Sequence, residues 1–228
     1  MTEARDPAEQ VVALVLAARG RVAAGRSMLV AVSGIDGSGK GYVTERAVAG
    51  LRARGINAVG INIDGFLSLP SVRFDAYRPA EGFYRQAIRF EELFERLVLP
   101  LVRDRSVRVT VDFAAETAVA YRPHTYDFRD VDVVPLEGIY LLRRDLRAHY
   151  DLAIWLECSF ETALVRALRR GQEGLPPDET IRAYRTIYFP AQLIHLALDA
   201  PCEAADAVID NDPGPTGRSH ARTAPTLS

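Results

Sequence analysis

The sequence predicts an α/β protein with a parallel sheet flanked by helices, and two patterns indicate this fold class. Short valine-rich stretches suited to buried strands alternate with longer stretches of helical periodicity, an order typical of parallel sheets. In addition, a glycine-rich loop separates the first predicted strand from the helix that follows it. Strand, loop and helix in this order form the unit from which such sheets are built.

The individual elements follow from hydrophobic runs and from the residues that interrupt them. Near the N-terminus, Asp6 and Pro7 are suited to the cap and the first turn of a helix. The predicted strands are 27–33, 56–63, 131–136, 151–156 and 204–210. The predicted helices are 40–54, 81–99 and 160–170. We expect the second of them to end at Pro100. Residues 105–121 are expected to be strand-rich, as a small antiparallel excursion.

Chain length and composition indicate one domain. A chain of 228 residues is of single-domain size, and we expect this domain to span residues 1–212, with the N-terminal helix within 1–25. The loop 171–178 holds two glycines and two prolines and is expected to belong to a lid. Proline, glycine, serine and threonine dominate the end of the chain, so 213–228 is expected to be a disordered tail.

Charge and cysteine content exclude several classes of function. The formal net charge of −2 gives no electrostatic reason to expect nucleic acid or an anionic membrane as a partner. Cys158 and Cys202 have no metal-binding or redox spacing, which fits a reducing compartment. The apolar run 11–18 is too short to span a bilayer. By elimination we expect a cytoplasmic protein, and a homo-oligomer remains open.

The predicted loop after the first strand has the spacing of a phosphate-binding loop. It contains the only lysine of the chain, Lys40, whereas the other 27 basic residues are arginines. A compact ammonium can reach between two phosphates, which arginine's planar fork does less well. Glycines let backbone N–H groups turn inward around phosphate oxygens, and the following helix N-terminus adds positive charge. The expected ATP-binding residues are Gly34, Ile35, Asp36, Gly37, Ser38, Gly39, Lys40, Gly41 and, further along the chain, Arg169. We expect Lys40 to be exposed in this loop. The alternative is an ordinary glycine-rich turn between strand and helix.

Gly41 departs from the motif, because phosphate loops carry serine or threonine at this position to ligate Mg²⁺. Thr44 is three residues further on, about 4.5 Å along the helix axis, and cannot simply replace that hydroxyl. Either a water takes its place on Mg²⁺ or the site has lost part of its catalytic power.

Two carboxylates follow predicted strands, at the sheet edge where ligands bind in α/β proteins. Asp64 ends the second strand, and Glu137 ends the strand at 131–136. Phosphoryl transfer needs a carboxylate that accepts a hydroxyl proton and another that holds Mg²⁺ or its waters. Alternatively, each carboxylate is a solvated loop residue or a helix cap.

Arginines cluster before the predicted lid loop. Arg166 and Arg170 are four residues apart and share a helix face, with Arg169 beside them. They could close over a triphosphate and stabilise charge on the transferred group. The alternative is a solvated basic face.

Several polar and aromatic residues between the second strand and Glu137 are candidates for holding an acceptor. Asp75 could bind sugar hydroxyls, while Tyr84 or His124 could touch a base or ring. The candidate set is Asp75, Tyr84, Arg122, His124 and Tyr126. Each of them could equally be a loop or surface residue.

Together these motifs resemble the uridine kinase-like branch of the P-loop kinases, over roughly residues 29–212. The resemblance rests on the phosphate loop, on Asp64-Gly65-Phe66, on Glu137-Gly138-Ile139 and on the arginine-bearing segment 161–170. It implies a P-loop NTPase fold with a helical lid and the use of ATP and Mg²⁺. It also implies that Asp64 is the catalytic base and that Glu137 lies near the metal.

The sequence thus predicts an ATP-dependent kinase of a small-molecule acceptor. The favoured reaction transfers the γ-phosphoryl group to the 5′-hydroxyl of uridine or cytidine, with Lys40, Asp64, Arg166 and Arg170 as catalytic residues. Glu137 would hold Mg²⁺ through water. One alternative is a kinase of another hydroxylated metabolite, such as a vitamin precursor or a sugar. The other is a weakly catalytic nucleotide-binding regulator of the same fold.

Overall fold

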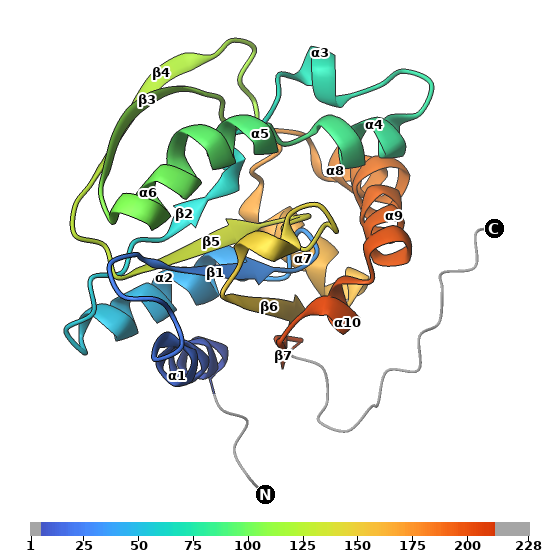
Figure 1. Ribbon diagram of the computed structural model, residues 1–228. Coiled ribbons are helices and arrows are strands. Elements are labelled where there is room, and N and C mark those ends of the chain that lie inside the picture. The colour runs from blue at the N-terminus through green and yellow to red at the C-terminus, as the bar shows by residue number, and fades with distance from the viewer. Residues whose placement is uncertain (1–5, 213–228) are drawn as a thin grey trace, which may run out of the picture.

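The computed structural model describes residues 6–212. The predicted tail at 213–228 lies outside these residues. Within them, a central sheet separates two layers of helices, as Figure 1 shows.

The central sheet has five strands, all parallel, in the order β2-β5-β1-β6-β7. Its strands are β1 (Met28–Ser33), β2 (Ile61–Asn62), β5 (Val133–Gly138), β6 (Leu152–Glu157) and β7 (Ala207–Asp210). The middle strands β1 and β5 are buried along their whole length, as expected where helices cover both faces of a parallel sheet. The α/β class predicted from the sequence is confirmed.

Each face of the sheet has its own hydrophobic core, because successive side chains of a strand point to opposite faces. In β1, Met28, Val30 and Val32 face one core and Leu29 and Ala31 the other. The first core is covered by α1 (Pro7–Arg19) and α2 (Lys40–Arg52), which pack against each other. In Figure 1 these two helices lie below the sheet. As predicted, α1 begins with Asp6 as its N-cap and Pro7 in its first turn.

The second core lies under the helical segments on the other face of the sheet. These segments are α4 (Pro79–Gln86), α5 (Phe90–Leu93), η2 (Phe94–Val98), α6 (Leu99–Asp104), α7 (Phe160–Arg170), α8 (Pro177–Ala183), η4 (Tyr184–Tyr188) and α9 (Phe189–Asp199). Four short segments complete the helical elements of the described residues: η1 (Ile63–Gly65), α3 (Pro70–Arg73), η3 (Arg147–His149) and α10 (Pro201–Ala204). The predicted helix 160–170 is present with the same bounds.

The continuous helix predicted at 81–99 is wrong in two respects. It breaks after α4, where the backbone of residues 87–89 pairs with the segment 66–68: the N–H of Ser68 donates to Ala87 and that of Arg89 to Phe66. Pro100 also fails to end the helix. The wider π turn η2 precedes it, and this turn accommodates a residue that lacks an N–H and would clash with an α-helical carbonyl. Pro190 follows the second π turn, η4, in the same way.

The antiparallel excursion expected in 105–121 is present but longer than predicted. Strands β3 (Val107–Phe113) and β4 (Arg122–Phe128) form a separate two-stranded sheet. The connection between them includes Glu116, which becomes important at the cavity described below.

The predicted strand 56–63 reduces to the two residues of β2, although Ala58 forms an isolated bridge to Val133. Asp64 therefore lies in the 3-10 turn η1 that follows, and not at a strand end. Glu137 lies inside β5, where its neighbours in register are Val32 and Asn62. The sheet thereby brings the phosphate loop after β1, the turn after β2 and Glu137 to one edge. Within residues 6–212, none of the helices is both long and apolar enough to cross a membrane.

Candidate active site

The phosphate loop connects β1 to α2, as the sequence predicts, and its backbone geometry requires glycine. Gly37 and Gly39 have φ angles of +77° and +91°, which favour residues without a Cβ. A Cβ at Gly37 would lie 2.5 Å from the carbonyl oxygen of Ala163, and one at Gly34 would lie 2.6 Å from that of Leu156. The loop is thus fitted closely against β6 and α7.

Lys40 begins α2 but is not exposed. Its side chain turns back over the loop, and Nζ donates a hydrogen bond to the carbonyl of Ile35 at 2.7 Å. Only 7% of the residue is accessible to solvent. The expectation of an exposed lysine is therefore wrong, because the loop folds around its ammonium and supplies an acceptor.

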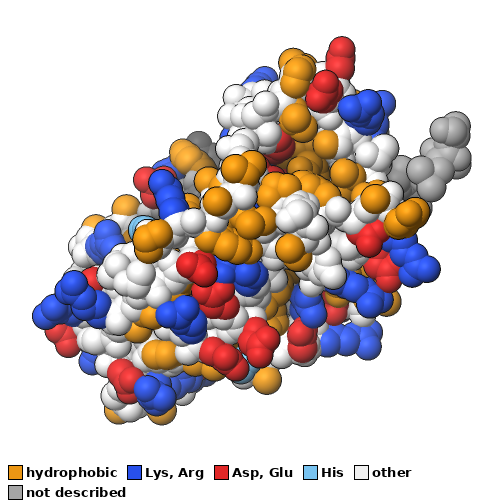
Figure 2. Space-filling view, turned by 90° about the horizontal axis from the view of Figure 1, so that it is seen from above, with side chains coloured by type: hydrophobic (Ala, Val, Ile, Leu, Met, Phe, Trp, Pro, Cys, Tyr) orange, Lys and Arg blue, Asp and Glu red, His pale blue; other side chains and the backbone are white. Residues whose placement is uncertain are grey.

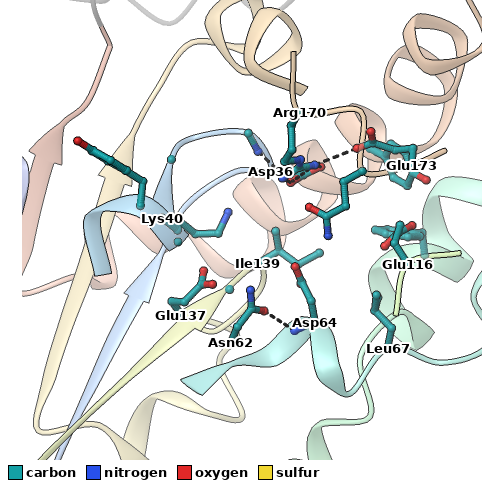
Figure 3. A pocket seen from close by; sticks show the side chains of 18 residues that line it. Asp36, Lys40, Asn62, Asp64, Leu67, Glu116, Glu137, Ile139, Arg170 and Glu173 are labelled. Atoms are coloured by element: carbon teal, nitrogen blue, oxygen red, sulfur yellow. Dashed lines mark hydrogen bonds and ion pairs between the residues drawn. The ribbon is translucent and has the colours of Figure 1, made fainter. Parts of the chain in front are cut away.

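A cavity of about 290 Å³ opens beside this loop. Lys40 and Glu137 lie at one end and Asp64 lies in its middle, as Figure 3 shows. The lining residues are Asp36, Gly37, Gly39, Lys40, Gly41, Tyr42, Asn62, Asp64, Leu67, Phe83, Glu116, Glu137, Gly138, Ile139, Arg170, Gln172, Glu173 and Tyr188. The fold therefore brings Lys40, Asp64, Glu137 and Arg170 to one cavity from four separate parts of the chain.

The carboxyl groups of Asp64 and Glu137 both have a raised pKa. Burial, followed by the negative charge of Asp36, raises the pKa of Asp64. Burial raises the pKa of Glu137 to about 7, although the ammonium of Lys40 opposes this shift. Perturbed carboxylates in a cavity are typical of sites that move protons or bind cations.

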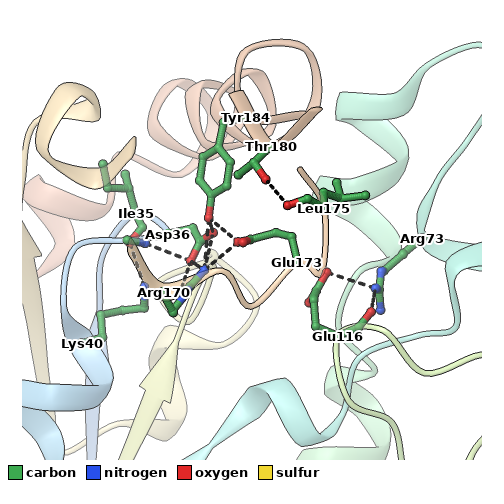
Figure 4. A network of polar contacts seen from close by, with 11 residues as sticks. Ile35, Asp36, Lys40, Arg73, Glu116, Arg170, Glu173, Leu175, Thr180 and Tyr184 are labelled. Atoms are coloured by element: carbon green, nitrogen blue, oxygen red, sulfur yellow. Dashed lines mark hydrogen bonds and ion pairs between the residues drawn. The ribbon is translucent and has the colours of Figure 1, made fainter. Parts of the chain in front are cut away.

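Asp36 behaves in the opposite way. Burial raises its pKa, but the positive charges of Arg170 and Lys40 outweigh burial, and the pKa lies below its usual value. Arg170 lies 3.4 Å from its Oδ1, and the hydroxyl of Tyr184 donates to its Oδ2. Figure 4 shows how Glu173 joins the same network through Arg170 and Tyr184. Asp36 thereby connects the phosphate loop to Arg170 at the end of α7.

The three predicted arginines have different positions. Arg170 lines the cavity. Arg166 instead supports the loop from outside: it donates to the carbonyls of Ser38 at 3.0 Å and Asn211 at 2.7 Å. Arg169 is exposed and does not line the cavity. In the structure, then, Arg170 alone of the three can meet a group in the cavity directly.

The five predicted acceptor residues do not line this cavity. Asp75 caps its own loop by accepting from the N–H groups of Tyr77 and Arg78. The Tyr84 hydroxyl donates to Asp199 at 2.6 Å, because this face of α4 packs on α9; the adjacent Phe83 lines the cavity instead. The other three, Arg122, His124 and Tyr126, lie on β4.

Sequence reasoning missed several residues of the cavity, among them the polar Asn62, Glu116, Gln172 and Glu173. Gln172 and Glu173 follow Arg170 in the predicted lid loop, so their place in the sequence beside a predicted catalytic residue indicates them. No such signal indicates Glu116, because it lies in the connection between β3 and β4, far along the chain from every motif.

The residues present fit a bound nucleotide and Mg²⁺. The Oγ atom of Ser38 is buried without a hydrogen-bond partner among the described residues, and a ligand oxygen could satisfy it. The Glu137 carboxylate reaches to 3.4 Å from where a Cβ of residue 41 would stand. The described residues contain no cluster of three or more metal-ligating side chains.

No family model matches the sequence, but several solved structures have the same fold. A structure from Bacillus stearothermophilus described as a possible uridine kinase has 20% identity and a TM-score of 0.71, covering 92% of this chain and 100% of that one. A structure from Silicibacter sp. TM1040, described as a candidate kinase of a fructose transport system, has 25% identity and a TM-score of 0.63, covering 87% and 98%. A D-glycerate 3-kinase from Cryptococcus neoformans has 14% identity and a TM-score of 0.57, covering 81% and 87%. This chain therefore has the fold of the uridine kinase-like P-loop kinases, as its resemblance to them implied.

Proposed function

We propose that the protein is an ATP-dependent kinase of a small hydroxylated acceptor, with the 5′-hydroxyl of uridine or cytidine as the first candidate. The observation that carries this proposal is the placement of Asp64 and Lys40 in one cavity, with Glu137 at its Lys40 end. A base, a phosphate-binding cation and a metal-binding carboxylate are the groups that phosphoryl transfer requires.

In this reaction Asp64 accepts the proton of the acceptor hydroxyl. The hydroxyl oxygen bonds to the γ-phosphorus while the bond from that phosphorus to the bridging oxygen breaks, and ADP leaves with the bonding electrons. Lys40 and the loop N–H groups hold the β- and γ-phosphates, and Arg170 faces the charge of the transferred group. Mg²⁺, when bound near Glu137, supplies neutralisation of the phosphate charge.

The test is turnover by the purified protein with ATP, Mg²⁺ and a panel containing uridine, cytidine, fructose, glycerate and pantothenate. Asp64→Asn should lower kcat by roughly 10²- to 10⁴-fold. Asp75→Asn is the matched control, because Asp75 lies in an exposed loop outside the cavity, and it should leave kcat unchanged. Equal activity of wild type and Asp64→Asn would remove Asp64 as the base.

The dependence on pH gives a second readout of Asp64. Since its pKa is raised, turnover should decline on acidification at a higher pH than the usual aspartate value of about 3.9. The folded state also holds this proton more tightly than the unfolded chain, so stability should fall as pH rises through the raised pKa. Asp64→Asn should remove that loss and melt at a higher temperature than wild type at pH 8, which shows that its inactivity is not unfolding.

The panel also separates the alternatives. Phosphorylation of fructose or pantothenate but of neither nucleoside would favour a sugar or a vitamin precursor as acceptor. ATP binding without turnover on any acceptor, with full biological function of Asp64→Asn, would favour a nucleotide-binding regulator.

A further inference from the structure

The part of the cavity beyond Asp64, away from Lys40, has its own polar groups. In Figure 3, Glu116 and Leu67 lie across the cavity from Lys40, with Asp64 between them. Glu173 and Gln172 line the cavity as well, together with the apolar side chains of Phe83 and Tyr188. An acceptor whose hydroxyl meets Asp64 must place the rest of its atoms among these groups.

Glu116 is held in place by an arginine that is itself inaccessible. Arg73 is 1% exposed and donates to the carbonyl of Ser68 at 2.9 Å. Its Nη2 contacts the Glu116 carboxylate at 3.1 Å and also the Glu116 carbonyl. Both Nη atoms of Arg73 are thus engaged, its buried Nε has no hydrogen-bond partner among residues 6–212, and the residue does not line the cavity. It fixes Glu116 without offering a positive charge to a ligand.

Glu173 has an oxygen that lacks a partner. Its side chain is only 5% exposed, and its Oε1 takes hydrogen bonds from Arg170 at 2.9 Å and from Tyr184 at 2.8 Å. Its Oε2 is buried with no hydrogen-bond partner among residues 6–212. A buried acceptor of this kind is costly unless a donor satisfies it, which points to a ligand that donates hydrogen bonds.

The positive charges that line the cavity are already committed. Arg170 contacts Asp36 and Glu173, and Lys40 lies at the phosphate loop with its amine on Ile35. The other charged side chains that line the cavity are all carboxylates: Asp36, Asp64, Glu116, Glu137 and Glu173. A negatively charged acceptor would meet several carboxylates, because the two cations of the cavity contact the phosphate loop and face the nucleotide.

Resting on the function proposed above, we propose that Glu116 and Glu173 bind hydroxyl hydrogens of the acceptor and select an uncharged polyhydroxylated molecule over an anionic one. Glu116 is then a specificity-determining residue. The carboxylate ends that face the cavity accept from the acceptor, and Arg73 and Arg170 keep them oriented. Apolar contact with Phe83 and Tyr188 completes the site.

The experiment compares acceptors in matched pairs that differ in one carboxylate: uridine with orotidine, glycerol with glycerate, and pantothenyl alcohol with pantothenate. We expect kcat/KM to be at least tenfold higher for the neutral member of any pair that is phosphorylated. Glu116→Gln should raise the KM for the neutral acceptor at least tenfold and reduce the discrimination, while kcat and the KM for ATP change less than twofold. Glu91→Gln, at an exposed position outside the cavity, is the control and should behave as wild type.

Preference for the anionic member, or an unchanged acceptor KM in Glu116→Gln, would overturn the inference. If Glu116→Gln does not fold, Glu173→Gln makes the same test without leaving Arg73 unpaired. Absence of turnover on every acceptor defeats the proposed function instead. Calorimetric binding of the same six compounds then decides the inference: tighter binding of neutral members that is lost in the variants supports it, and any other binding result overturns it.

Discussion

Gly41 is the residue at which this site departs most from a standard phosphate loop. It occupies the second position of α2, and a Cβ there would lie 3.4 Å from Oε1 of Glu137. That distance is ordinary contact, so the backbone leaves room for a serine. Glu137 itself is only 7% exposed and lines the cavity. A hydroxyl at residue 41 would thus lie beside the carboxylate that we assign to Mg²⁺.

We predict that Gly41→Ser lowers the Mg²⁺ concentration for half-maximal turnover by roughly fivefold, since one hydrogen bond or ligand contact contributes about 1 kcal/mol. Gly41→Ala is the matched control. Alanine stabilises the same helix by up to about 1 kcal/mol, which corresponds to ~2–4 °C in Tm, but it adds no hydroxyl. An equal shift in Mg²⁺ dependence for both variants would assign the effect to helix stability. Titration of Mg²⁺ in the assay, with thermal melts beside it, measures both.

At the scale of elements, the lid is joined to the phosphate loop by one polar network. The C-terminal end of α7, the loop after it and η4 contribute Arg170, Glu173 and Tyr184, and these meet Asp36 of the phosphate loop (Figure 4). The π turn η4 is part of this arrangement, because it contains Tyr184. Residues 171–176, the loop of this lid, contain Gly171 and Gly174 with positive φ angles. The network therefore joins this loop to the phosphate loop.

Tyr184→Phe tests this connection. The single hydroxyl hydrogen of Tyr184 is shared between Asp36 and Glu173, and a hydrogen bond to a charged group contributes roughly 1.5–3 kcal/mol. We expect hydrogen exchange of the amides in 171–176 to become faster by about tenfold or more, while amides of β1 and β5 exchange as in wild type. Tyr77→Phe, at a residue that is 96% exposed, serves as control. Unchanged protection of the loop in Tyr184→Phe would show that the network does not restrain it.

At the scale of the whole molecule, the face that Figure 2 shows carries side chains of both charges. Acidic and basic side chains alternate there, and hydrophobic ones gather toward the middle. The net charge of −2 agrees with this mixture. The cavity lies at the edge of the sheet where the phosphate loop, the turn after β2 and Glu137 meet.

Because the chain has a single lysine, the acylation rate of one side-chain amine tests whether the folded protein buries Lys40. Because the Lys40 amine is buried and bonded to the Ile35 carbonyl, we predict that an acylating reagent modifies it at least ~10-fold more slowly than N-α-acetyl-lysine. ATP should slow the reaction further, and 6 M guanidinium should restore the rate of the model amine. Mass spectrometry of the peptide containing Lys40 gives the rate. Native labelling as fast as the free amino acid would contradict the buried position.

Much of this architecture could be predicted from the sequence because it depends on local patterns. The alternation of buried strands and helices, the helix 160–170, and the loop between β1 and α2 all follow from periodicity and glycine spacing. Predictions failed where distant backbone intervened. The helix expected at 81–99 breaks because residues 87–89 pair with the segment 66–68, and no local signal shows that partner.

The sequence by itself determined that the chain carries a phosphate loop with one lysine and that Asp64 and Glu137 are candidate carboxylates. Only the tertiary structure decided which other side chains share their cavity. Tyr84, a strong candidate by type, turns toward Asp199, while Phe83 beside it and Glu116 from a distant connection line the cavity. The physical reason is that a motif fixes the backbone of a few consecutive residues, whereas the selection of an acceptor depends on which faces of separate elements pack together.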